Sequence, residues 1–329
     1  MKGNRGRFFA GVAVVLAFCL ALAGCGMNKE KAIEQMGQAL TDSSVIESGR
    51  LTGEISGTIS LGADSIPMEL TMEGAFKDQM QTMAMKMSGE VMGNPLDTET
   101  YQLDGKTYTL DPTTGGYIES PSATAGMDYQ QLMTLGQAEM VQLYIDGATA
   151  AEDFAFTEEE NGLRVSFTMP TEQLGQMQQQ ISSLMTDELL PALEEQMRQS
   201  VSEQMDALLE SMGGAEALQV DQAQLDALID QQVQMVMEME RQLFESLQIN
   251  GLSCDMLITD GVINDQTVGM QMEFALRDLV DSLAGSLGVT GTDTSTVPES
   301  CGLDMQIHAV IADRNQEIEI DFPDFDAAA

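Results

Sequence analysis

The chain has 329 residues, of which 53 are acidic and 14 are basic, so its formal net charge is −39 at pH 7. A field this negative repels nucleic acid and anionic lipid headgroups, which excludes electrostatic docking on either and favours solubility of the folded body. The length is sufficient for one large domain or two ordinary ones, each with a core of its own.

The first 24 residues have the features of an export signal. Lys2, Arg5 and Arg7 precede an apolar run at 8–22 that contains no acidic residue. A basic head, a short apolar core and small residues before a cleavage point describe a secretory signal rather than a spanning helix. The run ends in Leu-Ala-Gly-Cys, the pattern that a bacterial lipoprotein signal requires, with cleavage immediately before Cys25.

Lipidation of Cys25 would anchor the protein. Diacylglycerol on the thiol supplies two acyl chains, which is enough for stable anchoring, and palmitate is expected among the acyl groups. We therefore expect a signal peptide at 1–24, a lipidated cysteine and tether at 25–30, and a folded domain at 31–329 on the extracytoplasmic face of the cell membrane. Loss of three cations with the signal makes the net charge of the mature chain −42.

Strict alternation of apolar and polar residues begins after a short predicted helix at 30–40. The apolar positions share one parity in each of three segments, 51–61, 66–76 and 83–91. This period predicts strands with one solvated face. Asp104 and Gly105 separate two further strands and are a strong signal for a two-residue hairpin, so the sheet is predicted to be antiparallel.

The second half of the chain mixes helices and strands. One or two short helices are predicted at 127–147, and a hairpin with Asn161-Gly162 in its turn follows at 154–169. Residues 171–248 change to spacings of three and four, which predicts a long amphipathic helical hairpin with a break at Gly213-Gly214. Returning strands are predicted at 254–259, 267–276, 303–312 and 317–322.

Cys254 and Cys301 remain after removal of the signal and lipidation of Cys25. An even pair in an exported protein predicts a disulfide. The alternative is a metal site that these two cysteines share with His308.

Seven methionines lie within the 25 residues from Met68 to Met92. Most have the parity of the apolar positions, so they are predicted to face the interior. Methionine is flexible and suits either an irregular dry core or the lining of an apolar cavity. A copper site of thioethers is the third alternative, although such a site would be expected to add histidine or cysteine. We expect no metal and no cofactor.

The sequence contains none of the motifs that would indicate catalysis. His308 is the single histidine and lies at a polar position of its strand, which predicts a solvated side chain. There is no G-x-S-x-G, no H-E-x-x-H and no glycine-rich phosphate loop. The protein is therefore predicted not to be an enzyme.

The order of these features resembles that of the LolA/LppX-like lipoprotein carriers. A lipidated cysteine, a short leading helix, a meander of alternating strands, a central helical insertion and returning strands occur in the same sequence. The tract TETYQLDGKTYTLDPTTGGYIES at 98–120 is also similar to the central strands of uncharacterised Gram-positive lipoproteins. The resemblance implies an α+β fold, in which a curved antiparallel sheet, a half-barrel, is covered by a helical lid and carries the inserted hairpin at 171–248.

Members of that family hold acyl chains between sheet and helices, which implies a non-catalytic, membrane-anchored lipoprotein that binds a lipid or another apolar ligand. The alternative is an envelope interaction or sensing module with a dry core and no cargo. The expected partners are the membrane, through the anchor, and an apolar ligand; nucleic acid is not expected, and no protein partner is indicated. The candidate lining residues are Ile55, Met68, Leu70, Met72, Met85, Met87, Val165, Phe167, Met270, Met272 and Ile307.

Overall fold

The computed structural model describes residues 27–43, 46–91, 93–121, 137–184, 222–286 and 294–325, with single positions between 186 and 202. The predicted signal at 1–24 and the predicted lipidation site Cys25 lie outside the described residues.

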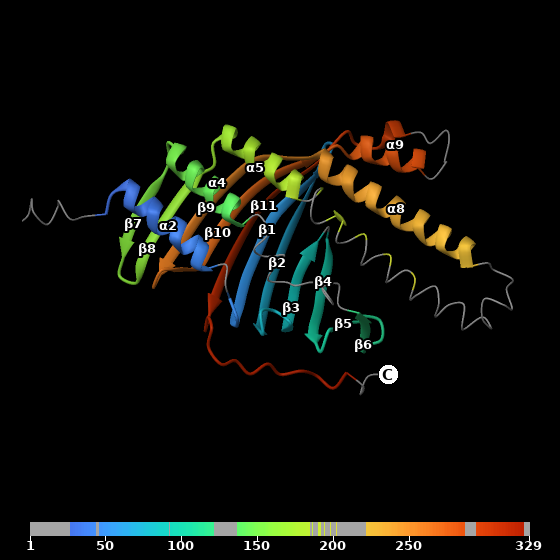
Figure 1. The fold of residues 1–329 in the computed structure, drawn as a ribbon, viewed down its shortest axis with the longest axis horizontal. Helices are drawn as coiled ribbons and strands as arrows, with labels where there is room; N and C mark the ends of the chain where they lie inside the picture. The colour runs from blue at the N-terminus through green and yellow to red at the C-terminus, as the bar shows by residue number, and fades with distance from the viewer. Residues whose placement is uncertain are drawn as a thin grey trace, which may run out of the picture.

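One antiparallel sheet organises the described chain, in the order β6-β5-β4-β3-β2-β1-β11-β10-β9-β8-β7 (Figure 1). Its eleven strands are β1 (Gly49–Leu61), β2 (Asp64–Lys77), β3 (Thr82–Val91), β4 (Asn94–Leu103), β5 (Lys106–Leu110), β6 (Tyr117–Pro121), β7 (Ala155–Glu159), β8 (Gly162–Thr168), β9 (Leu247–Thr259), β10 (Val262–Phe274) and β11 (Cys301–Ala312). The helices are α2 (Lys29–Ser43), α4 (Gln137–Ala150), α5 (Thr171–Leu184), α8 (Gln222–Ser246) and α9 (Leu276–Ser286). The predicted α+β class with an antiparallel sheet is confirmed.

The hairpin between β4 and β5 turns where its sequence predicts. Asp104 and Gly105 have φ values of 52° and 75°, the left-handed conformations that a tight two-residue turn requires. The hairpin between β7 and β8 differs by one position. Glu159 pairs with Gly162, so Glu160 and Asn161 form the turn and Gly162 belongs to the strand.

Strand register places the predicted apolar positions on one side of the sheet. Ile55 pairs with both Leu70 and Ile307, and Ile307 pairs with Val268, which pairs in turn with Cys254. Directly paired residues share a face, because side chains alternate with period two. We call this side the apolar face and the opposite side the polar face.

Helices α2, α4 and α5 cover the apolar face at the β7–β10 end of the sheet (Figure 1). The largest cluster of buried apolar side chains lies beneath them and includes Met36 from α2, Leu174 from α5, and Val165 and Met256 from the sheet. Burial of a side chain of this size contributes roughly 1.5–3 kcal/mol, so this end of the sheet provides the principal core.

The long insertion joins two neighbouring strands. It leaves β8 through α5 and returns through α8, and β9 then pairs directly with β8. The helix ends at Ser246 and the strand begins at Leu247, two residues before the predicted end of the helical pattern. The predicted break at Gly213-Gly214 lies outside the described residues.

The predicted strand at 317–322 is absent. β11 lies between β1 and β10 and is paired along both edges, so the residues that follow it have no free edge there. They leave the sheet instead and run beneath it towards β5 and β6 (Figure 1). We call residues 313–325 the C-terminal strap.

Candidate functional site

All eleven predicted lining residues lie on the apolar face, as their strand register requires. One row across the sheet shows the continuity of this face. Its members, from β8 to β4, are Phe167, Cys254, Val268, Ile307, Ile55, Leu70, Gly89 and Leu96. The apolar face is therefore one surface that spans both ends of the sheet.

The predicted lining residues differ in burial. Val165 is fully buried and Phe167 is 3% exposed, because both lie in the core beneath α2, α4 and α5. These two residues are core residues and are not part of an open lining. Leu70 is also buried, but it lies on β2, outside the helix-covered β7–β10 end of the sheet. The remaining eight are half-buried: Ile55, Met68, Met72, Met85, Met87, Met270, Met272 and Ile307.

The half-buried methionines occupy space that glycines leave on the neighbouring strand. A Cβ atom at Gly53 would lie 3.0 Å from the terminal methyl carbon of Met72, so the methionine side chain lies across the glycine. Met72 pairs in turn with Met87 on β3. Flexible thioether side chains over glycine gaps form a surface that can change shape to accommodate an apolar partner.

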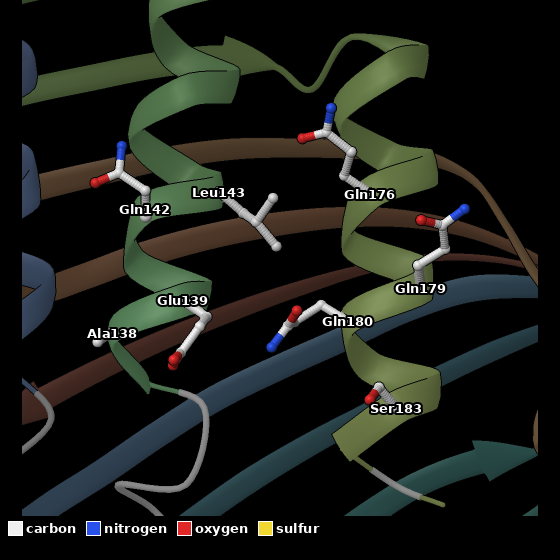
Figure 2. A pocket seen from close by; sticks show the side chains of 8 residues that line it. All are labelled: Ala138, Glu139, Gln142, Leu143, Gln176, Gln179, Gln180 and Ser183. Carbon is white, nitrogen blue, oxygen red and sulfur yellow. The ribbon is translucent and has the colours of Figure 1, made fainter.

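A groove of about 680 Å³ separates α4 from α5. Figure 2 shows Leu143 pointing from α4 towards α5, and Gln180 pointing from α5 towards α4. The groove is lined by Ala138, Glu139, Gln142, Leu143, Gln176, Gln179, Gln180 and Ser183. Four of these are glutamines, whose amides donate and accept hydrogen bonds, so the groove suits a polar surface better than an acyl chain. None of the predicted lining residues borders it.

A second groove, of about 720 Å³, lies between α8 and the preceding arm of the insertion. Leu190 and Pro191 border it on one side, and Met235 and Met237 on the other. Arg198 of the preceding arm forms an ion pair with Asp230 of α8, and Leu190 is 6% exposed. The two arms of the insertion are therefore in contact at these positions.

The predicted disulfide between Cys254 and Cys301 is wrong, since both cysteines are free. Cys254 pairs with Val268, and Cys301 pairs with Phe274. These partners are six residues apart on β10, which corresponds to about 20 Å along the strand. A disulfide requires Cα atoms within about 7 Å of each other, so this fold cannot form the bond.

The metal site proposed as the alternative to the disulfide is not assembled either. His308 lies on the polar face, where its Nε2 is 3.1 Å from Asp265 Oδ1, whereas Cys254 is buried on the apolar face. No cluster of three or more histidine, cysteine or acidic side chains suited to a metal occurs in the described part of the chain.

Sequence reasoning missed a group of aromatic residues on the polar face. Tyr101, Tyr108 and Tyr117 come together from β4, β5 and β6, and Phe325 of the C-terminal strap contacts all three rings. The sequence of the β4–β5 hairpin could have indicated part of this group, because Tyr101 pairs with Tyr108 across Asp104-Gly105. The contribution from the strap could not be read from local sequence.

Among the residues described, no helix is long and apolar enough to cross a membrane. No family model and no curated protein matches the chain. Among solved structures, the crystal structure of LprF from Mycobacterium bovis is similar to this chain, with a TM-score of 0.37 and 10% sequence identity. The likeness covers 91% of this chain and 99% of the mycobacterial one.

Proposed function

We propose that this chain is a membrane-anchored, non-catalytic lipoprotein that binds an apolar ligand, such as the acyl chain of a lipid, on the apolar face of β1–β4 and β11. The observation that carries the proposal is that helices cover one end of this face more completely than the rest of it. Helices α2, α4 and α5 bury it at the β7–β10 end, whereas Met68, Met72, Met85 and Met87 are only half-buried. The pattern before Cys25 supports anchoring by lipidation.

The mechanism would be desolvation. An acyl chain laid against the half-buried methionines exchanges water for apolar side chains and gains about 0.8 kcal/mol per buried CH₂ group. Methionine adapts its shape at little cost, so the face would accept chains that differ in length and unsaturation. The acidic body would repel anionic headgroups, so the ligand would be held by its tail rather than by its headgroup.

The second candidate is an envelope interaction module that carries no cargo. It is favoured by Val165 and Phe167, two predicted lining residues that lie instead in a closed core. If the apolar face of β1–β4 is likewise filled by the protein's own side chains, no ligand would be bound.

Native mass spectrometry separates the two candidates. A chain that begins at Gly26 would be exported to a bacterial periplasm, purified without detergent and sprayed from a volatile buffer. A co-purifying mass that organic solvent extracts as lipid would support the carrier. An apo mass that stays unchanged after incubation with mixed lipids would refute the carrier and favour the interaction module.

A further inference from the structure

The C-terminal strap begins with a firm attachment to the sheet. Arg314 donates hydrogen bonds from Nη1 to the Ser43 carbonyl at 3.1 Å, from Nη2 to the Ile263 carbonyl at 2.8 Å and from Nε to Asn264 Oδ1 at 3.2 Å. The amide of Asn315 donates to the Ser48 carbonyl at 2.8 Å. The position of the strap is therefore fixed as far as Gln316.

Beyond Gln316 the strap is held by side chains. Within the described chain, no backbone–backbone hydrogen bond involves residues 317–325. Ile318 is 7% exposed, and Phe322 and Phe325 make ring contacts with the sheet. This part of the strap can leave the sheet without breaking a backbone ladder, so its release costs the burial of a few side chains and the polar contacts that they make.

Phe325 occupies a preformed aromatic site on the polar face of β4–β6. Its ring stacks on Tyr108 with 3.9 Å between centroids and 8° between planes. It meets Tyr101 and Tyr117 edge-on, at 5.6 and 5.4 Å. Offset-stacked and edge-to-face contacts of this kind are favourable beyond the burial of their area. We call these three tyrosines the tyrosine site.

Contacts within the sheet hold the tyrosine site in place without Phe325. Glu99 Oε2 accepts hydrogen bonds from the hydroxyls of Tyr101 and Tyr117, at 2.8 and 3.0 Å. Lys86 donates to the other carboxylate oxygen at 2.5 Å. The rings of Tyr101 and Tyr117 also meet edge-on at 5.6 Å. The site would therefore keep its shape if the strap left.

The charge of the strap works against its own binding. Glu317, Glu319 and Asp321 are exposed along it, while the whole chain carries a net charge of −39. Like charges repel over about 10 Å at 0.1 M salt, so an acidic strap binds an acidic body less tightly than a neutral segment of the same shape would.

We propose that the tyrosine site is a docking site for an extended segment of a partner protein that presents two phenylalanines three residues apart with neutral or basic flanks. Residues 317–325 are the chain's own occupant and block the site until such a segment displaces them. The site lies on the face opposite to the proposed ligand face, so this docking is independent of cargo binding.

The test uses a fluorescein-labelled peptide of residues 317–325 and the full chain from Gly26 with Phe322→Ala and Phe325→Ala, which leaves the tyrosine site vacant. Fluorescence anisotropy should show roughly tenfold or tighter binding to this variant than to the unaltered chain, because an intramolecular occupant reduces the apparent affinity by the fraction of time for which the site is vacant. Adding Tyr108→Ala should abolish binding. A peptide with its acids replaced by their amides should bind more tightly than the native one.

The proposal is overturned if the chain with Phe322→Ala and Phe325→Ala binds no peptide, or if adding Tyr108→Ala leaves the binding unchanged. A dimer of the unaltered chain that dissociates on Phe322→Ala/Phe325→Ala substitution would assign the site to a second copy and overturn the partner assignment.

Discussion

Cys254 and Cys301 face the same side of the sheet, but β10 separates their strands and their pairing partners on it are six residues apart. Sharing a face therefore does not bring the two thiols together. Cys254 lies in the core at 3% exposure, and Cys301 is half-buried at the start of β11. Neither thiol therefore contributes a covalent cross-link to the stability of the sheet.

Differential thiol labelling should reveal this separation. In a chain that begins at Gly26 these are the only two cysteines, so any label reports on one of them. Cys301 should react with maleimide in the native protein. Cys254 should react only in denaturant, because burial excludes the reagent and raises the pKa of its thiol to about 12. Intact mass after each step measures this, and Cys301→Ser is the control that should show no native labelling. A protein that takes up no label even in denaturant would contain the disulfide.

Glu99 should stabilise the fold more than a surface acid does. Glu99→Gln removes the ion pair with Lys86 and weakens the acceptor for two tyrosine hydroxyls, so it should lower the free energy of unfolding by about 1–2 kcal/mol at pH 7. Glu119→Gln is the matched control, since its pair with Lys106 joins side chains that are about half exposed, and it should cost less than about 0.5 kcal/mol. Urea denaturation measures both.

The pH dependence of the Glu99 effect has a definite sign. Hydrogen bonds from Lys86 and then from Tyr101 lower the pKa of the Glu99 carboxyl below its ordinary value of 4.5. A group whose pKa is lowered in the folded state contributes stability that is present above its unfolded pKa and is lost as the pH falls through the folded pKa. The difference between Glu99→Gln and the unaltered chain should therefore stay constant from pH 8 to pH 6 and shrink below about pH 4.5. A difference that grows in acid would contradict this assignment.

Arg314 should be the residue that fastens the C-terminal strap. Arg314→Ala removes three hydrogen bonds and leaves the carbonyls of Ser43 and Ile263 without that partner, so it should cost about 2 kcal/mol. Arg50→Ala removes an exposed pair with Asp313 at the same edge and should cost under about 0.5 kcal/mol. Thermal melts compare the two, and equal costs would mean that the Arg314 contacts contribute nothing specific.

Local pattern was sufficient to predict the faces of the strands. Ile55, Leu70 and Ile307 were each placed by the parity of their own strand, and register then brought them to one surface. The Asp104-Gly105 turn followed from two residues whose positive φ values are accessible at that position. These features depend on neighbours in sequence, so they can be read without the fold.

Features that depend on distant segments were not predicted correctly. Ile318, Ile320 and Phe322 alternate as a strand would, but both edges of β11 are already paired. Helix α9 begins at Leu276, a residue that the period of β10 had assigned to the strand. The separation of Cys254 from Cys301 likewise depends on which strand lies between them. In each case the deciding fact is the order of strands in the sheet, which no local period encodes.

The proposed ligand face can be tested with two neighbouring residue pairs that point in opposite directions. Met72 pairs with Met87 on the apolar face, and Thr71 pairs with Ser88 on the polar face, where their hydroxyls are 2.9 Å apart. Met72→Lys/Met87→Lys would put two charges where an acyl chain is proposed to lie, at a desolvation cost that should weaken binding at least roughly tenfold. Thr71→Lys/Ser88→Lys adds the same charge at the same height of the same strands and should change affinity by less than about twofold.

Titration with a fluorescent long-chain fatty acid measures both pairs, with far-UV circular dichroism to show that each variant is folded. Met72→Gln/Met87→Gln keeps the side-chain length while adding polar atoms, and should fall between the lysine pair and the unaltered chain. Equal losses from the two lysine pairs would place the effect in overall charge rather than in the apolar face. If both lysine pairs keep the affinity of the unaltered chain for the fatty acid, the ligand binds away from β2 and β3. The half-buried methionines would then be part of a dry core.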